Sequence, residues 1–208
     1  AVSDSLVSCV EDGSRIESRR GMSFAALTSG ICLANAGLGV VHGFASSAGG
    51  MYNIPHGVLC GTLMAKANEV NVRELLKKNV NPAALRKYAS LGKLFLGENS
   101  GTDDYFIDGF IRFLSDITGR FNIPRLAGYG IAGEDIGSIC IRTEIKNNPV
   151  RLEQEDLEEI LVDDQAQDAV AEELELLVLL VVAVAVLIGE RLVREGAVDE
   201  VIVLELDA

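Results

Sequence analysis

The only two histidines of the chain, His42 and His56, lie in one glycine-rich stretch, GLGVVHGFASSAGGMYNIPHGVLCG, at residues 37–61. A neutral imidazole is a good ligand for a divalent transition metal, and two of them facing one point would begin a metal site. A spacing of 14 residues between two histidines also arises often by chance. The spacing alone therefore leaves open both a shared metal site and two unrelated histidines.

The residues around the two histidines add support for a shared site but leave both alternatives open. His42 follows the sequence GLG, which is typical of a helix end, and His56 follows Pro55, which is typical of a helix start. We interpret the intervening residues 43–55, which include the loop-like segment SSAGGMYNIP, as a loop of 13 residues that lets both rings face one point. The positive potential at a helix N-terminus lowers the pKa of an imidazole and keeps it neutral, which is the form that binds a metal.

Helical patterns dominate the elements that must position this stretch. Leu59, Leu63, Ala67 and Val70 recur at helical spacing and predict one buried face. Strand patterns are nearly absent before residue 195, so we predict an all-α fold, a helical bundle. We expect helices over residues 17–39, 56–79, 81–97, 102–121, 132–148 and 150–161, with a turn at 122–130.

Single residues mark some of the helix boundaries. Asn81 before Pro82, and Thr102 further on, are predicted N-caps. The acidic pair that follows Thr102 is interpreted as decoration of a helix N-terminus rather than as a catalytic pair. Cys32 and Cys60 fall on apolar helix faces, and we interpret both as core residues.

Composition narrows the class of protein. A net charge of −13 argues against a nucleic-acid partner, because the phosphate backbone would repel the chain. The four cysteines are widely and irregularly spaced, with no CxxC pair and no signal-peptide pattern, so we expect reduced thiols and a cytoplasmic location. With 49% apolar residues, the 208-residue chain has enough apolar volume for a sizeable core.

The C-terminal part differs from the rest in charge and composition. Residues 151–208 hold 17 acidic and 3 basic residues and use only nine residue types, so we predict a helical domain at 1–161 and a low-complexity tail at 162–208. Within this tail, Leu176–Ile188 is an unbroken run of 13 apolar residues. As a helix it would span only about 20 Å, which favours a buried segment over a membrane span, and we expect no membrane partner.

The central stretch ANAGLGVVHGFASSAGGMYNIPHG resembles the signature of the iron-containing (group III) alcohol dehydrogenases. The similarity extends from about Ser5 to Leu161 and includes the segments SGICLANAGLG, KYASLGKLFLG, NIPRL and NNPVRLEQEDLEEIL. This family combines an N-terminal dinucleotide-binding domain with a C-terminal helical domain. The resemblance implies that the chain is the helical domain.

The same resemblance implies a metal-dependent, NAD(P)-linked alcohol or aldehyde oxidoreductase. In that family one aspartate and three histidines hold a divalent metal, usually iron and sometimes zinc, and His42 and His56 match the last two histidines. The metal polarises the substrate oxygen while a hydride moves to or from the nicotinamide. The implied partners are a small alcohol or aldehyde and further copies of the chain, as a homo-oligomer.

Two departures from the family pattern bear on activity. The family's aspartate and first histidine lie upstream of Ala1, as does its nucleotide-binding domain, so we expect the chain to be inactive by itself. Ser46 stands where many members have a histidine near the nicotinamide; it is the candidate catalytic residue, although a serine cannot act as a base near pH 7. The alternative function is a non-catalytic helical fragment or interaction module that retains only the fold.

Overall fold

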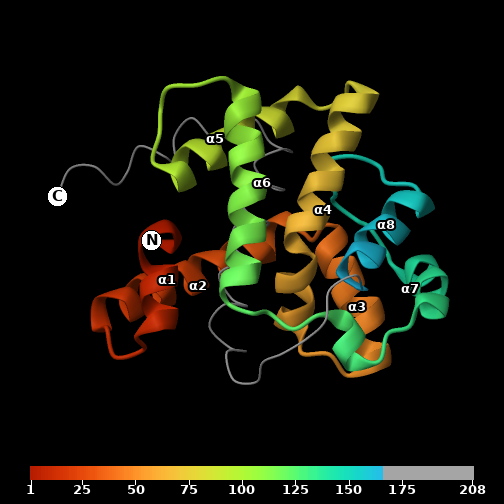
Figure 1. Cartoon of the computed structure of the whole chain (residues 1–208). Coiled ribbons are helices and arrows are strands. Elements are labelled where there is room, and N and C mark those ends of the chain that lie inside the picture. Colours follow the sequence, from red (N-terminus) through yellow and green to blue (C-terminus); the bar gives the residue numbers. More distant parts are fainter. Residues whose placement is uncertain (166–208) are drawn as a thin grey trace.

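The computed structural model describes residues 1–165, and within them the fold is all-α, as predicted (Figure 1). No strand occurs in these residues. The eight helices and two short 3-10 turns are, in chain order, α1 (Val2–Glu11), α2 (Ile16–Ala36), α3 (Val40–Tyr52), α4 (His56–Lys78), α5 (Pro82–Leu96), α6 (Asp103–Arg120), η1 (Leu126–Tyr129), η2 (Gly133–Asp135), α7 (Ile136–Arg142) and α8 (Gln154–Gln165).

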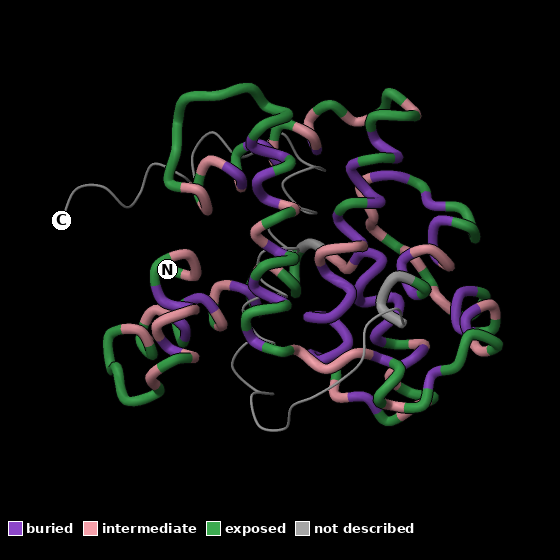
Figure 2. The backbone as a smooth tube through the Cα atoms, viewed as in Figure 1, coloured by how far each residue is buried: buried purple, intermediate pink, exposed green. Residues whose placement is uncertain are grey.

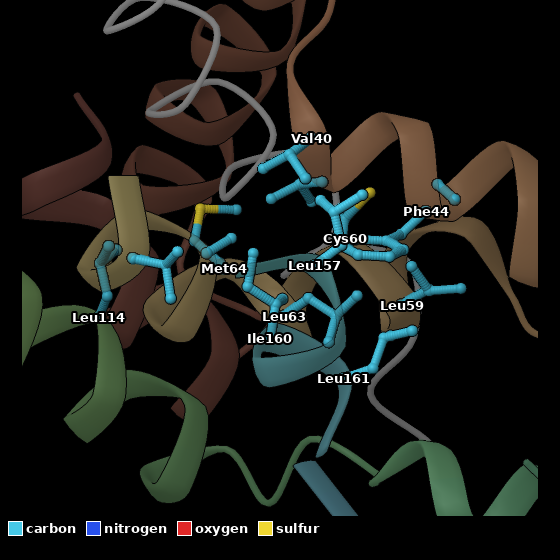
Figure 3. Packing of buried hydrophobic residues seen from close by; sticks show 14 of the residues in the cluster. Val40, Phe44, Leu59, Cys60, Leu63, Met64, Leu114, Leu157, Ile160 and Leu161 are labelled. Atoms are coloured by element: carbon cyan, nitrogen blue, oxygen red, sulfur yellow. The ribbon is translucent and has the colours of Figure 1, made fainter. Parts of the chain in front are cut away.

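Helix α4 is the central element. It contacts α3, α5, α6 and α8, and buried residues concentrate along it and on the sides of the helices that face it (Figures 1 and 2). The predicted apolar face is confirmed, because Leu59, Leu63, Ala67 and Val70 are all fully buried. Leu59 and Leu63 pack with residues of α3 and α8 in the core shown in Figure 3. His56 is the first residue of this helix.

The predicted N-caps are confirmed. Asn81 Oδ1 accepts a hydrogen bond from the Ala84 N–H at 3.2 Å, with Pro82 in the first turn of α5. Thr102 Oγ1 accepts one from the Tyr105 N–H at 3.2 Å and begins α6. These side chains satisfy amide groups that have no partner inside the helix, so the two boundaries can be read from the sequence.

The predicted loop between the two histidines is wrong for most of its length. Residues 40–52 form helix α3, and only the three residues Asn53–Pro55 separate it from α4. Glycine and serine favour loops, but Phe44, Ala45 and Ala48 bury one side of this helix against the core. Tertiary burial therefore outweighs the weak helix propensity of the segment.

Other helix boundaries also differ from the prediction. Helix α7 is limited to Ile136–Arg142, because residues 143–148 leave the helix and lie against α3 instead. The last helix begins at Gln154 and continues to Gln165. The N-terminal helix α1, which packs on α2, is not among the helices expected from the sequence.

The apolar run Leu176–Ile188 and the rest of the low-complexity tail after residue 165 lie outside the described residues. Among the helices of residues 1–165, none is by itself both long and apolar enough to cross a membrane. One pair, Ile16–Asn35 with Val40–Tyr52, meets the length and composition criteria together but is bent by 94° at its break.

A buried carboxylate lies near the C-terminal end of α4. Glu74 is 1% exposed, and its carboxylate pairs with Lys77 at 3.0 Å, Lys78 at 3.2 Å and Arg73 at 3.4 Å. The hydrogen bond from Lys77 is the largest effect that holds the pKa of Glu74 below its ordinary value of 4.5; desolvation opposes it. The ionised form of Glu74 therefore stabilises the fold.

The expected result for Glu74→Gln is a loss of stability that depends on pH. A lowered carboxyl pKa in the folded state contributes stability that is present above 4.5 and is lost as the pH falls through the folded value. The gap between wild type and variant should therefore be full at pH 7 and shrink below pH ~4.5. Urea unfolding at several pH values measures it, with the exposed Glu17→Gln as the control. A gap that does not change with pH contradicts the prediction.

Candidate metal centre

The two histidines are brought together by the tight turn between α3 and α4. His42 lies in the first turn of α3, and His56 is the first residue of α4. Asn53 ends α3 in the left-handed conformation at φ 51°, which reverses the chain within three residues. The ring centroids of His42 and His56 lie 5.3 Å apart, with 51° between the ring planes. The expectation that the rings face a common point agrees with this geometry, although a helix and a turn, rather than a loop, produce it.

A third donor atom lies beside the histidine pair. Cys60 follows His56 by one helical turn on α4, and its Sγ lies 3.6 Å from His56 Nε2. One ligand atom from each of His42, His56 and Cys60 lies within 4.8 Å of the other two. Cys60 is buried, as expected for a core residue, and Figure 3 places it beside Phe44 of α3. The signal for this cluster is the His-x-x-x-Cys spacing, which puts both side chains on one face of a helix.

Burial dominates the electrostatics of this cluster. His42 is 5% exposed, and desolvation by burial, followed by the nearby His56, lowers the pKa of His42 to about 4. A neutral His42 near pH 7 agrees with the expectation from the sequence, but the main cause of its lowered pKa is burial rather than the potential at a helix N-terminus. His42 Nδ1 is buried and has no hydrogen-bond partner. Because an unpartnered buried polar atom is costly, a neutral ring in this state fits a metal or another ligand that would pair with it.

The chemistry of the three donors fits a divalent transition metal. Imidazole nitrogen and cysteine sulfur are ligands for zinc and related ions, and they bind as neutral imidazole and thiolate. Burial raises the pKa of Cys60 to about 12, so its thiol stays protonated near pH 7 unless a cation lowers that value.

A pocket of about 290 Å³ opens next to His42. Ser46, the candidate catalytic residue, is exposed on α3 one turn after His42 and lines this pocket with it. The pocket is also lined by the last residue of α7 and by the segment that follows it, and no sequence pattern connects these residues with the histidines. The complete lining is Leu38, Gly39, His42, Gly43, Ser46, Arg142, Glu144 and Lys146.

The segment 143–148 holds the first half of α3 in place. Asn148 Oδ1 accepts a hydrogen bond from the Val40 N–H at 3.3 Å, which supplies the cap that Gly39 cannot provide. The Asn148 amide also donates to Asn71 Oδ1 of α4 at 2.6 Å. This contact therefore links the N-terminus of α3 to α4, only two residues from His42.

A glycine makes this contact possible. A Cβ on Gly43 would lie 2.6 Å from the backbone oxygen of Glu144 and 3.0 Å from the Thr143 methyl group. A backbone oxygen cannot rotate away as a flexible side chain can, so any larger residue at position 43 would push segment 143–148 off α3.

The expected result for Gly43→Ala is therefore destabilisation by about 1–3 kcal/mol, through overpacking. Gly50→Ala is the matched control on the same helix, because a Cβ there meets nothing within 4 Å. The control should be as stable as the wild type or more stable by up to ~1 kcal/mol, since alanine is a better helix former than glycine. Urea denaturation of the two variants checks this; equal stabilities would show that segment 143–148 does not restrict position 43.

The helical fold and the paired histidines define the class of protein. The chain belongs to the iron-containing alcohol dehydrogenase family: residues 1–164 match its C-terminal domain, described as Fe-containing alcohol dehydrogenase family, C-terminal. The resemblance seen in the sequence is thereby confirmed. Among solved structures, 1,3-propanediol oxidoreductase superposes with a TM-score of 0.69 at 25% identity, covering 78% of this chain and 42% of that one. Alcohol dehydrogenase from Oenococcus oeni gives 0.65 at 27% identity, with the same coverage.

Several sequence relatives are alcohol dehydrogenases. Alcohol dehydrogenase 4 of Saccharomyces cerevisiae is 31% identical over 135 residues, which are 64% of this chain and 32% of that protein. The NAD-dependent methanol dehydrogenase of Bacillus methanolicus is 32% identical over 140 residues, 65% of this chain and 34% of that protein. The 1,3-propanediol dehydrogenase of Citrobacter freundii is 35% identical over 101 residues, 48% and 23% respectively. The chain thus spans about a third or less of these relatives.

Proposed function

We propose that this chain is the metal-binding helical half of a metal-dependent, NAD(P)-linked alcohol or aldehyde oxidoreductase. The observation that carries the proposal is the pairing of His42 and His56, whose rings lie 5.3 Å apart in the C-terminal domain of this family. The names of the relatives support a small alcohol or aldehyde as the substrate, with NAD or NADP as the hydride carrier.

His42 and His56 would hold the divalent metal, iron or zinc. When bound, the metal supplies Lewis-acid polarisation of a substrate oxygen. The contribution of the chain itself is to keep His42 neutral and to hold both rings in place. Burial prevents protonation of His42 near pH 7, and the turn between α3 and α4 sets the direction of both rings.

The pocket beside His42 would receive the substrate. Its volume of about 290 Å³ suits a small molecule, and its walls carry the cations Arg142 and Lys146 and the carboxylate of Glu144. Ser46 could orient a substrate hydroxyl by donating or accepting a hydrogen bond, but it cannot act as a general base near pH 7. A proton would therefore have to leave through another group or through solvent.

The alternative is a non-catalytic helical module that retains only the fold. Self-association belongs to either version of the proposal. Its support is a row of exposed apolar side chains on α2, formed by Phe24, Leu27 and Ile31. A cytoplasmic location also remains part of the proposal, and its support is the wide, irregular spacing of the cysteines.

Metal loading and a nicotinamide assay test the proposal together. The metal-free chain is loaded with Fe²⁺ or Zn²⁺, and reduction of NAD⁺ or NADP⁺ is followed with methanol, propanol and 1,3-propanediol. We expect one metal ion per chain and no turnover by the chain alone. Metal-dependent turnover that His56→Ala abolishes would instead show a self-sufficient enzyme. A chain that binds no metal would contradict the proposal.

A further inference from the structure

Cys60 lies close enough to His56 for both residues to bind one metal ion. Its Sγ lies 3.6 Å from His56 Nε2, and both residues project from the same face of α4. Two donors bound to one tetrahedral zinc, with bonds of ~2.0–2.3 Å, lie roughly 3.3–3.8 Å apart. The observed separation falls within that range before any side chain moves.

An S–H···N hydrogen bond between Cys60 and His56 would explain this one distance but not the rest of the cluster. His42 contributes a ligand atom within 4.8 Å of the other two, and its Nδ1 is buried without a partner. A hydrogen bond between Cys60 and His56 leaves His42 Nδ1 without a partner. A cation placed among the three donors would use all three residues at once.

We propose that Cys60 binds the metal through its thiolate as a third ligand from this chain, beside His42 and His56. This inference rests on the proposed function, because it concerns the same metal. On binding, the S–H bond breaks, its proton passes to solvent, and the sulfur forms the bond to the metal. A positive charge at the donors offsets the cost that burial imposes on the thiolate.

A sulfur ligand changes which metals the site prefers. Two imidazoles and one thiolate suit borderline and soft ions such as Zn²⁺ and Co²⁺, whereas Mg²⁺ and Mn²⁺ prefer oxygen donors. The chain should therefore bind Co²⁺ and Zn²⁺ in preference to Mn²⁺.

Cobalt absorption spectroscopy tests this ligand directly. Titration of the full metal-free chain with Co²⁺ should produce a sulfur-to-cobalt charge-transfer band in the near ultraviolet. Cys60→Ser should lose this band and bind Co²⁺ at least ~10-fold more weakly. The matched control is Cys32→Ser, a free cysteine on α2 outside the cluster, which should keep both the band and the affinity.

A second measurement avoids any substitution. X-ray absorption of the Zn²⁺-loaded wild type should show one sulfur neighbour at ~2.3 Å, even if Cys60→Ser fails to fold. Cobalt binding without the band, a band that survives in Cys60→Ser, or a zinc shell of only nitrogen and oxygen would overturn the role of Cys60 while leaving the histidine pair in place. A wild-type chain that binds neither metal would overturn both this inference and the proposed function.

Discussion

Replacing His56 with alanine should lower the affinity of the chain for Zn²⁺ by at least ~100-fold, because loss of a direct ligand exceeds the ~10–100-fold typical of groups that only support one. His56 is exposed, so its removal leaves no cavity in the core. His42→Ala should have an effect of the same size on affinity, but His42 is buried and its removal also tests packing. Competition with a chromophoric chelator measures both constants.

The control for these variants is Met51→Ala, which changes an exposed side chain at the far end of α3. It should bind Zn²⁺ with wild-type affinity. Circular dichroism of each variant establishes that the helices remain. If His56→Ala, with its helical signal intact, binds zinc as tightly as the wild type, then the histidine pair is not the metal site.

Replacing Gly92 with alanine should cause the largest loss of stability of any glycine-to-alanine change in the described residues, about 3 kcal/mol or more. A Cβ at this position would lie 2.0 Å from the backbone oxygen of Phe106 and 2.5 Å from its carbonyl carbon. Because the obstacle is the backbone of α6, no side-chain rotation relieves it. Helices α5 and α6 must move apart, although they form the most extensive helix pair within residues 1–165.

Gly30→Ala provides the matched control for Gly92→Ala. Gly30 also lies inside a helix, α2, but a Cβ there meets nothing within 4 Å. This control should gain ~0.5–1 kcal/mol through helix propensity alone. The free energies of unfolding in urea compare the two variants. A loss below ~1 kcal/mol for Gly92→Ala would mean that α5 and α6 adjust far more easily than close packing implies.

The sequence by itself determined the features that depend on neighbouring residues. Asn81 and Thr102 mark helix starts, because a cap needs only an acceptor and an amide three residues later. The buried face of α4 follows from apolar residues at helical spacing. The two histidines attracted attention through their type and context, and the motif around them identified the family that the whole domain then confirmed.

The tertiary structure decided the features that depend on residues far apart in the chain. Helix α3 forms because Phe44, Ala45 and Ala48 are buried against the core, although their local sequence resembles a loop. Segment 143–148 leaves the helical conformation because Asn148 and its neighbours pair with α3, about 100 residues earlier.

The candidate metal site also depends partly on local sequence and partly on the tertiary structure. The sequence supplied His42, His56 and the His-x-x-x-Cys spacing, but only folding buries His42, leaves its Nδ1 without a partner and sets Arg142 and Glu144 across the pocket. Many side chains together bury His42, and the desolvation that results lowers its pKa. No short stretch of sequence determines how many side chains will surround this ring. Residue types and local spacing thus determine which donors are available, whereas long-range packing determines where they meet and in which protonation state.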